Sequence, residues 1–65
     1  MSPHKQAEKD LKAAGYIEKR KDNSHVIWFH PELKVIIPLK RHDFNDNDLK
    51  YIRKEIKQNE RRRGN

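Results

Sequence analysis

The sequence contains no cysteine, which excludes both a disulfide staple and a zinc site built on thiolates. Its four histidines and scattered carboxylates show no metal-ligand spacing, so we expect no structural metal and no cofactor. No apolar run approaches the ~18 residues that span a membrane, and the N-terminus has no apolar signal-peptide core. We therefore expect a cytoplasmic protein that binds neither a membrane nor a small-molecule ligand.

Hydrophobic residues are also scarce: they make up 32% of the chain, against 40% for charged residues. The 65 residues leave room for a single domain, 1–65. The core of so small a domain rarely supplies more than about 3–5 kcal/mol of net stability. Stability must then come from regular local structure, from oligomerisation or from a partner.

The charge is strongly one-sided, with a formal net charge of +6 at pH 7. Contacts of lysine and arginine with phosphates are favoured by counterion release, so this balance indicates a polyanionic partner such as nucleic acid. The alternative is that the charge serves solubility alone.

The most β-prone stretch runs from Ser24 to Pro31, SHVIWFHP, and it predicts a strand from His25 to His30. The four residues before it, Lys-Asp-Asn-Ser at 21–24, are typical of a hairpin turn. This turn would place the imidazole of His25 at the mouth of the strand, among lysines and arginines. His25 is therefore the most functional-looking residue of the chain.

Both faces of this strand are apolar, because alternation puts Ile27 and Phe29 on one face and Val26 and Trp28 on the other. Two helices in so short a chain cannot cover both faces. We expect one face to be left for a partner or to be only partly shielded. Trp28 is expected to pack in the core or against that partner, although an exposed tryptophan would also stack on a base.

The segments around this strand carry clear boundary signals. Ser2-Pro3 predicts the start of a helix and Gly15 its end. Residues 16–20 read as a first strand, and residues 35–39 as a third. Pro38 makes that third strand an edge strand, or marks its end, because proline cannot donate to a ladder.

Asn45 or Asp46 is expected to cap a last helix. The apolar stripe of that helix consists of Leu49, Ile52 and Ile56, with Tyr51 on a flank. Residues 59–65, NERRRGN, have no apolar periodicity and are expected to form a flexible basic tail. The resulting order of elements predicts an α+β fold, αβββα, with both helices on one face of a three-stranded sheet.

Several of these segments occur together in one known family: Gly15-Tyr16, Ser24-His25, His30-Pro31, the run Val-Ile-Ile-Pro at 35–38 and the closing helix at 49–58. With this set, residues 3 to 58 resemble the HicA family of bacterial toxins, which are mRNA interferases of type II toxin–antitoxin systems. The resemblance implies a fold like a double-stranded-RNA-binding domain, with an antiparallel sheet. It also implies an endonuclease that cleaves messenger RNA with His25 as its single catalytic residue, and a HicB-like antitoxin that neutralises it.

The residue types around His25 suit such a reaction. RNA is cut without a metal when its own 2′-hydroxyl attacks the adjacent phosphate, which requires a base, a proton for the leaving 5′-oxygen and cations. One histidine can supply either proton transfer. The expected RNA contacts are Lys19, Arg20, Lys21, Ser24, Lys40 and Arg41.

Three positions differ from the family pattern. Asn23 replaces a glycine before Ser-His, Asn47-Asp48 replaces Gly-Thr at the last helix, and Lys40 stands in place of a histidine. These differences keep a second hypothesis open, in which the chain is a non-catalytic nucleic-acid-binding module on the same fold.

The other polar features have structural interpretations. We expect His30 to hold the end of its strand through backbone hydrogen bonds, and His42 to be a loop residue rather than a phosphate contact. The run Arg61–Arg63 is either a phosphate-tracking arm or a solvated tail.

Overall fold

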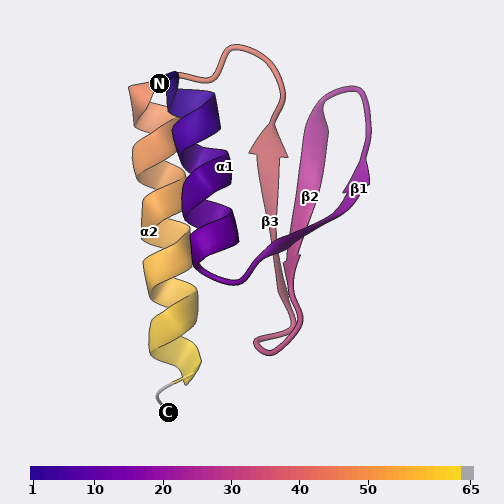
Figure 1. Cartoon of the computed structure of the whole chain (residues 1–65). Helices are drawn as coiled ribbons and strands as arrows, with labels where there is room; N and C mark the ends of the chain where they lie inside the picture. The colour runs from indigo at the N-terminus through magenta and orange to yellow at the C-terminus, as the bar shows by residue number, and fades with distance from the viewer. Residues whose placement is uncertain (64–65) are drawn as a thin grey trace.

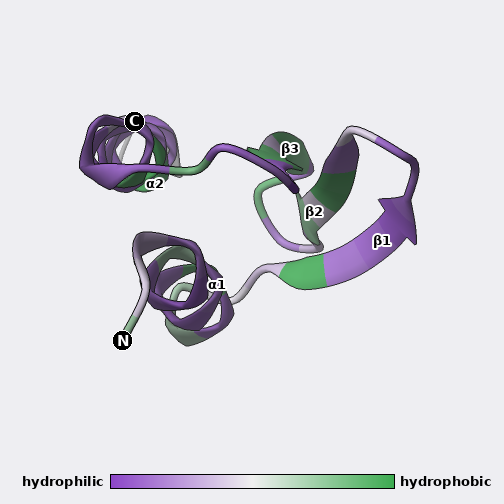
Figure 2. Ribbon diagram, turned by 90° about the horizontal axis from the view of Figure 1, so that it is seen from above, coloured by the Kyte–Doolittle hydropathy of each residue, from purple (hydrophilic) through white to green (hydrophobic). Residues whose placement is uncertain are grey.

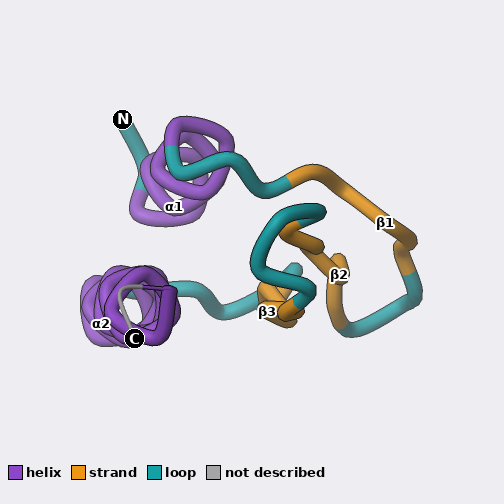
Figure 3. The backbone as a smooth tube through the Cα atoms, turned by 90° about the horizontal axis from the view of Figure 1, so that it is seen from below, coloured by secondary structure: helices purple, strands orange, loops and turns teal. Residues whose placement is uncertain are grey.

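Three strands form one antiparallel sheet in the order β1 (Ile17–Lys21), β2 (His25–His30) and β3 (Val35–Lys40). The structure, a computed structural model, describes residues 1–63. Two helices, α1 (Pro3–Ala13) and α2 (Asp46–Arg63), run side by side in the same direction on one side of the sheet (Figures 1 and 3). The predicted α+β order is confirmed, and it is consistent with a fold like a double-stranded-RNA-binding domain.

Both helices begin at side-chain caps. The Ser2 Oγ accepts a hydrogen bond from the Lys5 backbone N–H (3.2 Å), with proline in the first helical position as predicted. The Asn45 Oδ1 accepts from the N–H groups of Asn47 and Asp48, while the Asp48 carboxylate accepts from the Asn45 N–H (3.0 Å). This reciprocal pair is a capping box, and it identifies Asn45 as the cap of α2.

The end of α1 depends on Gly15, whose φ is +97°. The N–H of Gly15 donates to the Lys12 carbonyl and the N–H of Tyr16 to the Leu11 carbonyl, which is the Schellman arrangement. A Cβ atom at Gly15 would lie 2.9 Å from the His30 Nε2. Only glycine therefore satisfies both the backbone angle and the close approach of β2.

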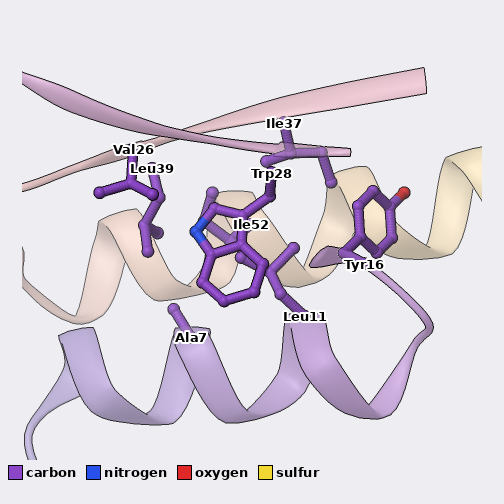
Figure 4. Packing of buried hydrophobic residues seen from close by; sticks show 8 residues of the cluster. All are labelled: Ala7, Leu11, Tyr16, Val26, Trp28, Ile37, Leu39 and Ile52. Atoms are coloured by element: carbon purple, nitrogen blue, oxygen red, sulfur yellow. The ribbon is translucent and has the colours of Figure 1, made fainter. Parts of the chain in front are cut away.

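The core forms where the two helices meet the sheet. Alternate residues of β2 are buried, and Trp28, which is 1% exposed, lies on the side of the sheet that faces α1 (Figure 4). Its burial confirms packing rather than base stacking. The buried hydrophobic cluster consists of Ala7, Leu11, Tyr16, Val26, Trp28, Ile37, Leu39 and Ile52.

The opposite face of the sheet is left uncovered by the helices. β1 is exposed along its whole length and lies beyond β2, at the edge away from α2 (Figure 2). Ile17 and Ile36 are each 53% exposed, and Ile27 and Phe29 are half-buried. Pro38 lies in β3, which is the other edge strand, as its proline predicted.

α2 is longer than the sequence predicted. The tail expected over residues 59–65 is helical as far as Arg63, so that boundary was wrong, and residues 64–65 lie outside the described residues. Asn59 lies seven residues after Ile52, on the same side of the helix, and is 8% exposed. Its Nδ2 donates to the Tyr16 Oη (2.9 Å), so a polar residue continues the buried stripe. Within the described chain, neither helix is long and apolar enough to cross a membrane.

Candidate active site

His25 opens β2 and lies directly across the ladder from Lys40, the last residue of β3. Its side chain is half-buried, on the side of the strand opposite the buried residues. Both side chains line a pocket of about 310 Å³ where this end of the sheet meets the first turns of α2. The structure therefore brings these two predicted site residues together.

The turn before β2 holds the backbone of His25 from two sides. The Asp22 Oδ1 accepts hydrogen bonds from the N–H groups of Ser24 (2.8 Å) and His25 (2.7 Å), and the Asp22 N–H donates to the His25 carbonyl (2.9 Å). The bond from His25, followed by that from Ser24, keeps the pKa of Asp22 below its ordinary value of 3.8. At neutral pH an ionised acceptor therefore orders this turn.

Arg41 ties the segment after β3 to the same turn. Its Nη1 donates to the Asp22 carbonyl oxygen (2.7 Å), and its backbone N–H donates to the Ser24 carbonyl oxygen (3.0 Å). Arg41 and Ser24 are exposed and lie in the two segments that flank the His25–Lys40 pair. A guanidinium carries five donors, so this structural role still leaves donors for a phosphate.

Lys40 forms an ion pair with an acidic residue of the same pocket, Asp48. Its Nζ lies 3.5 Å from the Asp48 Oδ2 and donates to the Asp43 carbonyl oxygen (3.2 Å). The same Asp48 carboxylate completes the capping box of α2. Because the Lys40 side chain is about half exposed, this ion pair contributes little stability, but it partly neutralises the cation that pairs across the ladder with His25.

Sequence reasoning missed part of the pocket. The remaining lining residues are Pro38, Phe44, Asp48, Tyr51 and Ile52. Asp48, Tyr51 and Ile52 are spaced i, i+3 and i+4, which places them on neighbouring positions of one helix side. That spacing was visible in the sequence, but it gave no indication that the first turns of α2 lie beside His25.

The basic residues of β1 are spread along the strand rather than gathered at the pocket. Lys21 and Arg20 pair with the two β2 residues that follow His25. Lys19 lies at a bulge, and its Nζ is 5.0 Å from the centre of the Phe29 ring. Phe29 is four residues beyond His25, or ~13 Å along a strand, so Lys19 does not share the pocket with His25.

His30 has a structural role, as predicted. It is 6% exposed, its Nδ1 accepts from the Leu33 N–H, and its Nε2 donates to the Ala14 carbonyl oxygen, both at 3.1 Å. Both ring nitrogens are thereby used. His42 is exposed in the bend at 41–43. Among residues 1–63, no group of three or more His, Cys, Asp or Glu side chains could hold a metal ion.

Comparison with known proteins agrees with the resemblance seen in the sequence. A family model described as "HicA toxin of bacterial toxin-antitoxin" matches residues 4–60, a range that contains every residue of the pocket. Neither a search among curated proteins nor one among solved structures gave a match.

Proposed function

The chain belongs to the HicA toxin family of bacterial toxin–antitoxin systems, and on that premise we propose that it is an endoribonuclease that cleaves messenger RNA in the cytoplasm. A cognate HicB-like antitoxin holds it silent. The observation that carries the proposal is the pocket in which the imidazole of His25 and the ammonium of Lys40 lie together. It offers a proton-transfer group beside a cation, on a protein with a net charge of +6.

The proposed reaction uses the RNA's own nucleophile. His25 acts as the general base or the general acid, and water makes the other proton transfer: the 2′-hydroxyl loses its proton, its oxygen bonds to the adjacent phosphorus, and the bond from phosphorus to the 5′-oxygen breaks. The leaving 5′-oxygen takes up a proton, and the products are a 2′,3′-cyclic phosphate and a 5′-hydroxyl. Charge on the phosphate increases during the attack, and Lys40, which lines the same pocket as His25, would offset it.

The other expected contacts hold the RNA rather than react with it. Ser24 and Arg41 flank the pocket. Arg20 pairs with Ile27 and lies on the same face of the sheet as His25, whereas Lys21 pairs with the buried Val26 and lies on the other face. Lys19, over the Phe29 ring, would meet a different phosphate of the same strand. Such contacts are independent of sequence, because they are made to the backbone.

The test is cleavage of an unstructured RNA by the purified toxin, with fragment ends analysed for cyclic phosphate. His25→Ala should lower the cleavage rate by roughly 10²–10⁴-fold while leaving RNA affinity within about twofold. His42→Ala is the matched control, because it removes an exposed loop histidine outside the pocket. A chelator should leave the rate unchanged, since no step is assigned to a metal.

A His25→Ala variant that cleaves as fast as the parent would remove the catalytic assignment. A parent that binds RNA with a steep salt dependence but never cleaves it would instead favour the non-catalytic binding module. The partial neutralisation of Lys40 by Asp48 is the feature that favours this second function.

A further inference from the structure

Tyr51 is the exposed aromatic wall of the pocket beside His25. We propose that Tyr51 stacks on one unpaired nucleobase of the RNA, next to the phosphate that meets His25 and Lys40. The proposal rests on the proposed function for its substrate, and it adds a base-binding subsite to a site otherwise described only by phosphate chemistry.

The exposure of Tyr51 is not explained by the fold. Tyr51 is 59% exposed, whereas Ile52, the next residue of α2, is 3% exposed and belongs to the core. Ile52 therefore anchors this turn of α2 in the core, and the packing of the helix does not depend on Tyr51. A large exposed aromatic side chain that lines a pocket is a typical feature of single-strand binding sites, where successive bases stack on such rings.

The pocket walls around Tyr51 are held in place. The Phe44 ring packs edge-to-face on His4, with centroids 5.4 Å apart and planes at 85°. Asp48 is fixed by its hydrogen bond from Asn45, and Lys40 by its contacts with Asp48 and Asp43. A flat ligand thus meets a preformed surface, which lowers the entropy lost on binding.

The lining of the pocket fits a base better than a phosphate alone. Pro38, Phe44 and Tyr51 offer apolar and aromatic surface, while Lys40 and Asp48 offer charged groups in the lining of the same pocket. At about 310 Å³ it is at the lower end of the range for small-ligand pockets, so it suits one base rather than several. The ammonium of Lys40 can pair with the phosphate attached to that base.

Binding is measured in a His25→Ala background, so that the RNA stays intact, by fluorescence anisotropy with a short labelled single-stranded RNA. Tyr51→Leu keeps an apolar side chain but removes the ring, and it should weaken RNA binding by roughly 5- to 150-fold. Tyr51→Phe keeps the ring and should stay within about twofold of the parent. Inorganic polyphosphate, which has charge but no bases, should bind all three proteins equally.

Gln58→Ala is the matched control, because Gln58 lies on the same side of α2 two turns away, is exposed and does not line the pocket. It should leave RNA affinity unchanged. With His25 restored, Tyr51→Leu should raise the KM for RNA far more than it lowers kcat, and Tyr51→Phe should restore the KM.

Three results would overturn the subsite. The first is that Tyr51→Leu leaves both the RNA affinity and the KM for RNA unchanged. Another is an equal loss of polyphosphate binding, which would reduce the role of Tyr51 to folding or charge placement. The third is an intact RNA affinity with a weakened antitoxin complex, which would make the pocket a protein-binding site. The first two leave cleavage by His25 standing. Conversely, the unmodified protein could fail to cleave RNA while Tyr51→Leu still loses RNA affinity. That combination would support the base-binding subsite and reject the nuclease activity.

Discussion

Asn59 and Tyr16 lie 43 residues apart in the sequence and are joined by a buried hydrogen bond, in which the Asn59 Nδ2 donates to the Tyr16 Oη at 2.9 Å. Tyr16 also packs edge-to-face on His30, with ring centroids 5.0 Å apart. His30 in turn donates to the Ala14 carbonyl oxygen. This series of contacts fastens the last turns of α2, the end of α1 and the end of β2 to one another.

The Asn59–Tyr16 bond should matter most when only one partner is removed. Tyr16→Phe leaves the Asn59 amide buried without its acceptor, which should lower the free energy of unfolding by about 1–3 kcal/mol. The double variant Tyr16→Phe with Asn59→Leu should recover much of that loss, since neither member of the bond remains buried and unpaired. Urea unfolding of the two single variants and the double variant measures the coupling, with Gln58→Ala as an exposed control. Losses that simply add in the double variant would contradict it.

Gly15 should tolerate no other residue. In Gly15→Ala the backbone must keep a φ of +97° with a Cβ, and that Cβ would lie 2.9 Å from the His30 Nε2. We expect destabilisation by more than about 1 kcal/mol, measured by thermal unfolding. Lys34, with a φ of +57°, is the comparison site. Lys34→Gly should cause no comparable loss of stability, because it removes a Cβ from a residue at positive φ instead of adding one. A loss equal to that of Gly15→Ala would contradict the cost assigned to a positive φ.

The fold could be predicted because its signals are local. Ser2 and Gly15 delimit α1 through caps that depend on neighbouring residues, and the β-branched and aromatic run delimits β2. Pro38 predicted an edge strand because proline itself lacks the N–H that a central strand needs. The end of α2 was missed because Asn59 is polar, and its burial depends on a phenol far away in the sequence.

The site could be predicted only in part. His25 and Lys40 were both named, and the antiparallel register makes them neighbours. The contributions of Asp48 and Tyr51 were missed because they depend on how α2 packs beside the end of β3, which no local pattern encodes. Lys19 was grouped with Lys21 by sequence, but its ammonium lies over Phe29, four residues along β2 from His25, and neither lysine lines the pocket.

Asp48 should restrain RNA binding through its ion pair with Lys40. Asp48→Asn keeps an oxygen that can accept the N–H of Asn45, but it frees the ammonium for a phosphate. At low salt we expect tighter RNA binding, and a plot of log K against log salt that steepens by about 0.7 for one added contact with a single strand. Asp46→Asn removes the same charge from the same turn of α2 without touching the pocket. Equal gains in both variants would show only a general charge effect, and affinity independent of salt would contradict phosphate binding altogether.

The uncovered face of the sheet should be the surface that meets the antitoxin. It carries four apolar side chains, two of them 53% exposed, in a domain whose helices both lie on the other side: Ile17, Ile27, Phe29 and Ile36. Exposed apolar patches of this kind on small domains mark interaction sites. The cations of Lys19 and Arg20 border the patch, so the expected partner surface is apolar with an acidic rim.

The prediction is tested by titrating the purified toxin with the product of the adjacent gene. Ile36→Glu adds a carboxylate to the predicted interface, and its burial without a partner should weaken the complex at least tenfold, or about 1.4 kcal/mol. The free toxin should keep its melting temperature, because Ile36 is already in contact with water. Lys9→Gln, on an exposed position of α1 behind the sheet, lowers the net charge by the same one unit and should leave the complex intact. An antitoxin that binds Ile36→Glu as tightly as the parent would have to cover another surface, and the end of the sheet at His25 would be the next one to test.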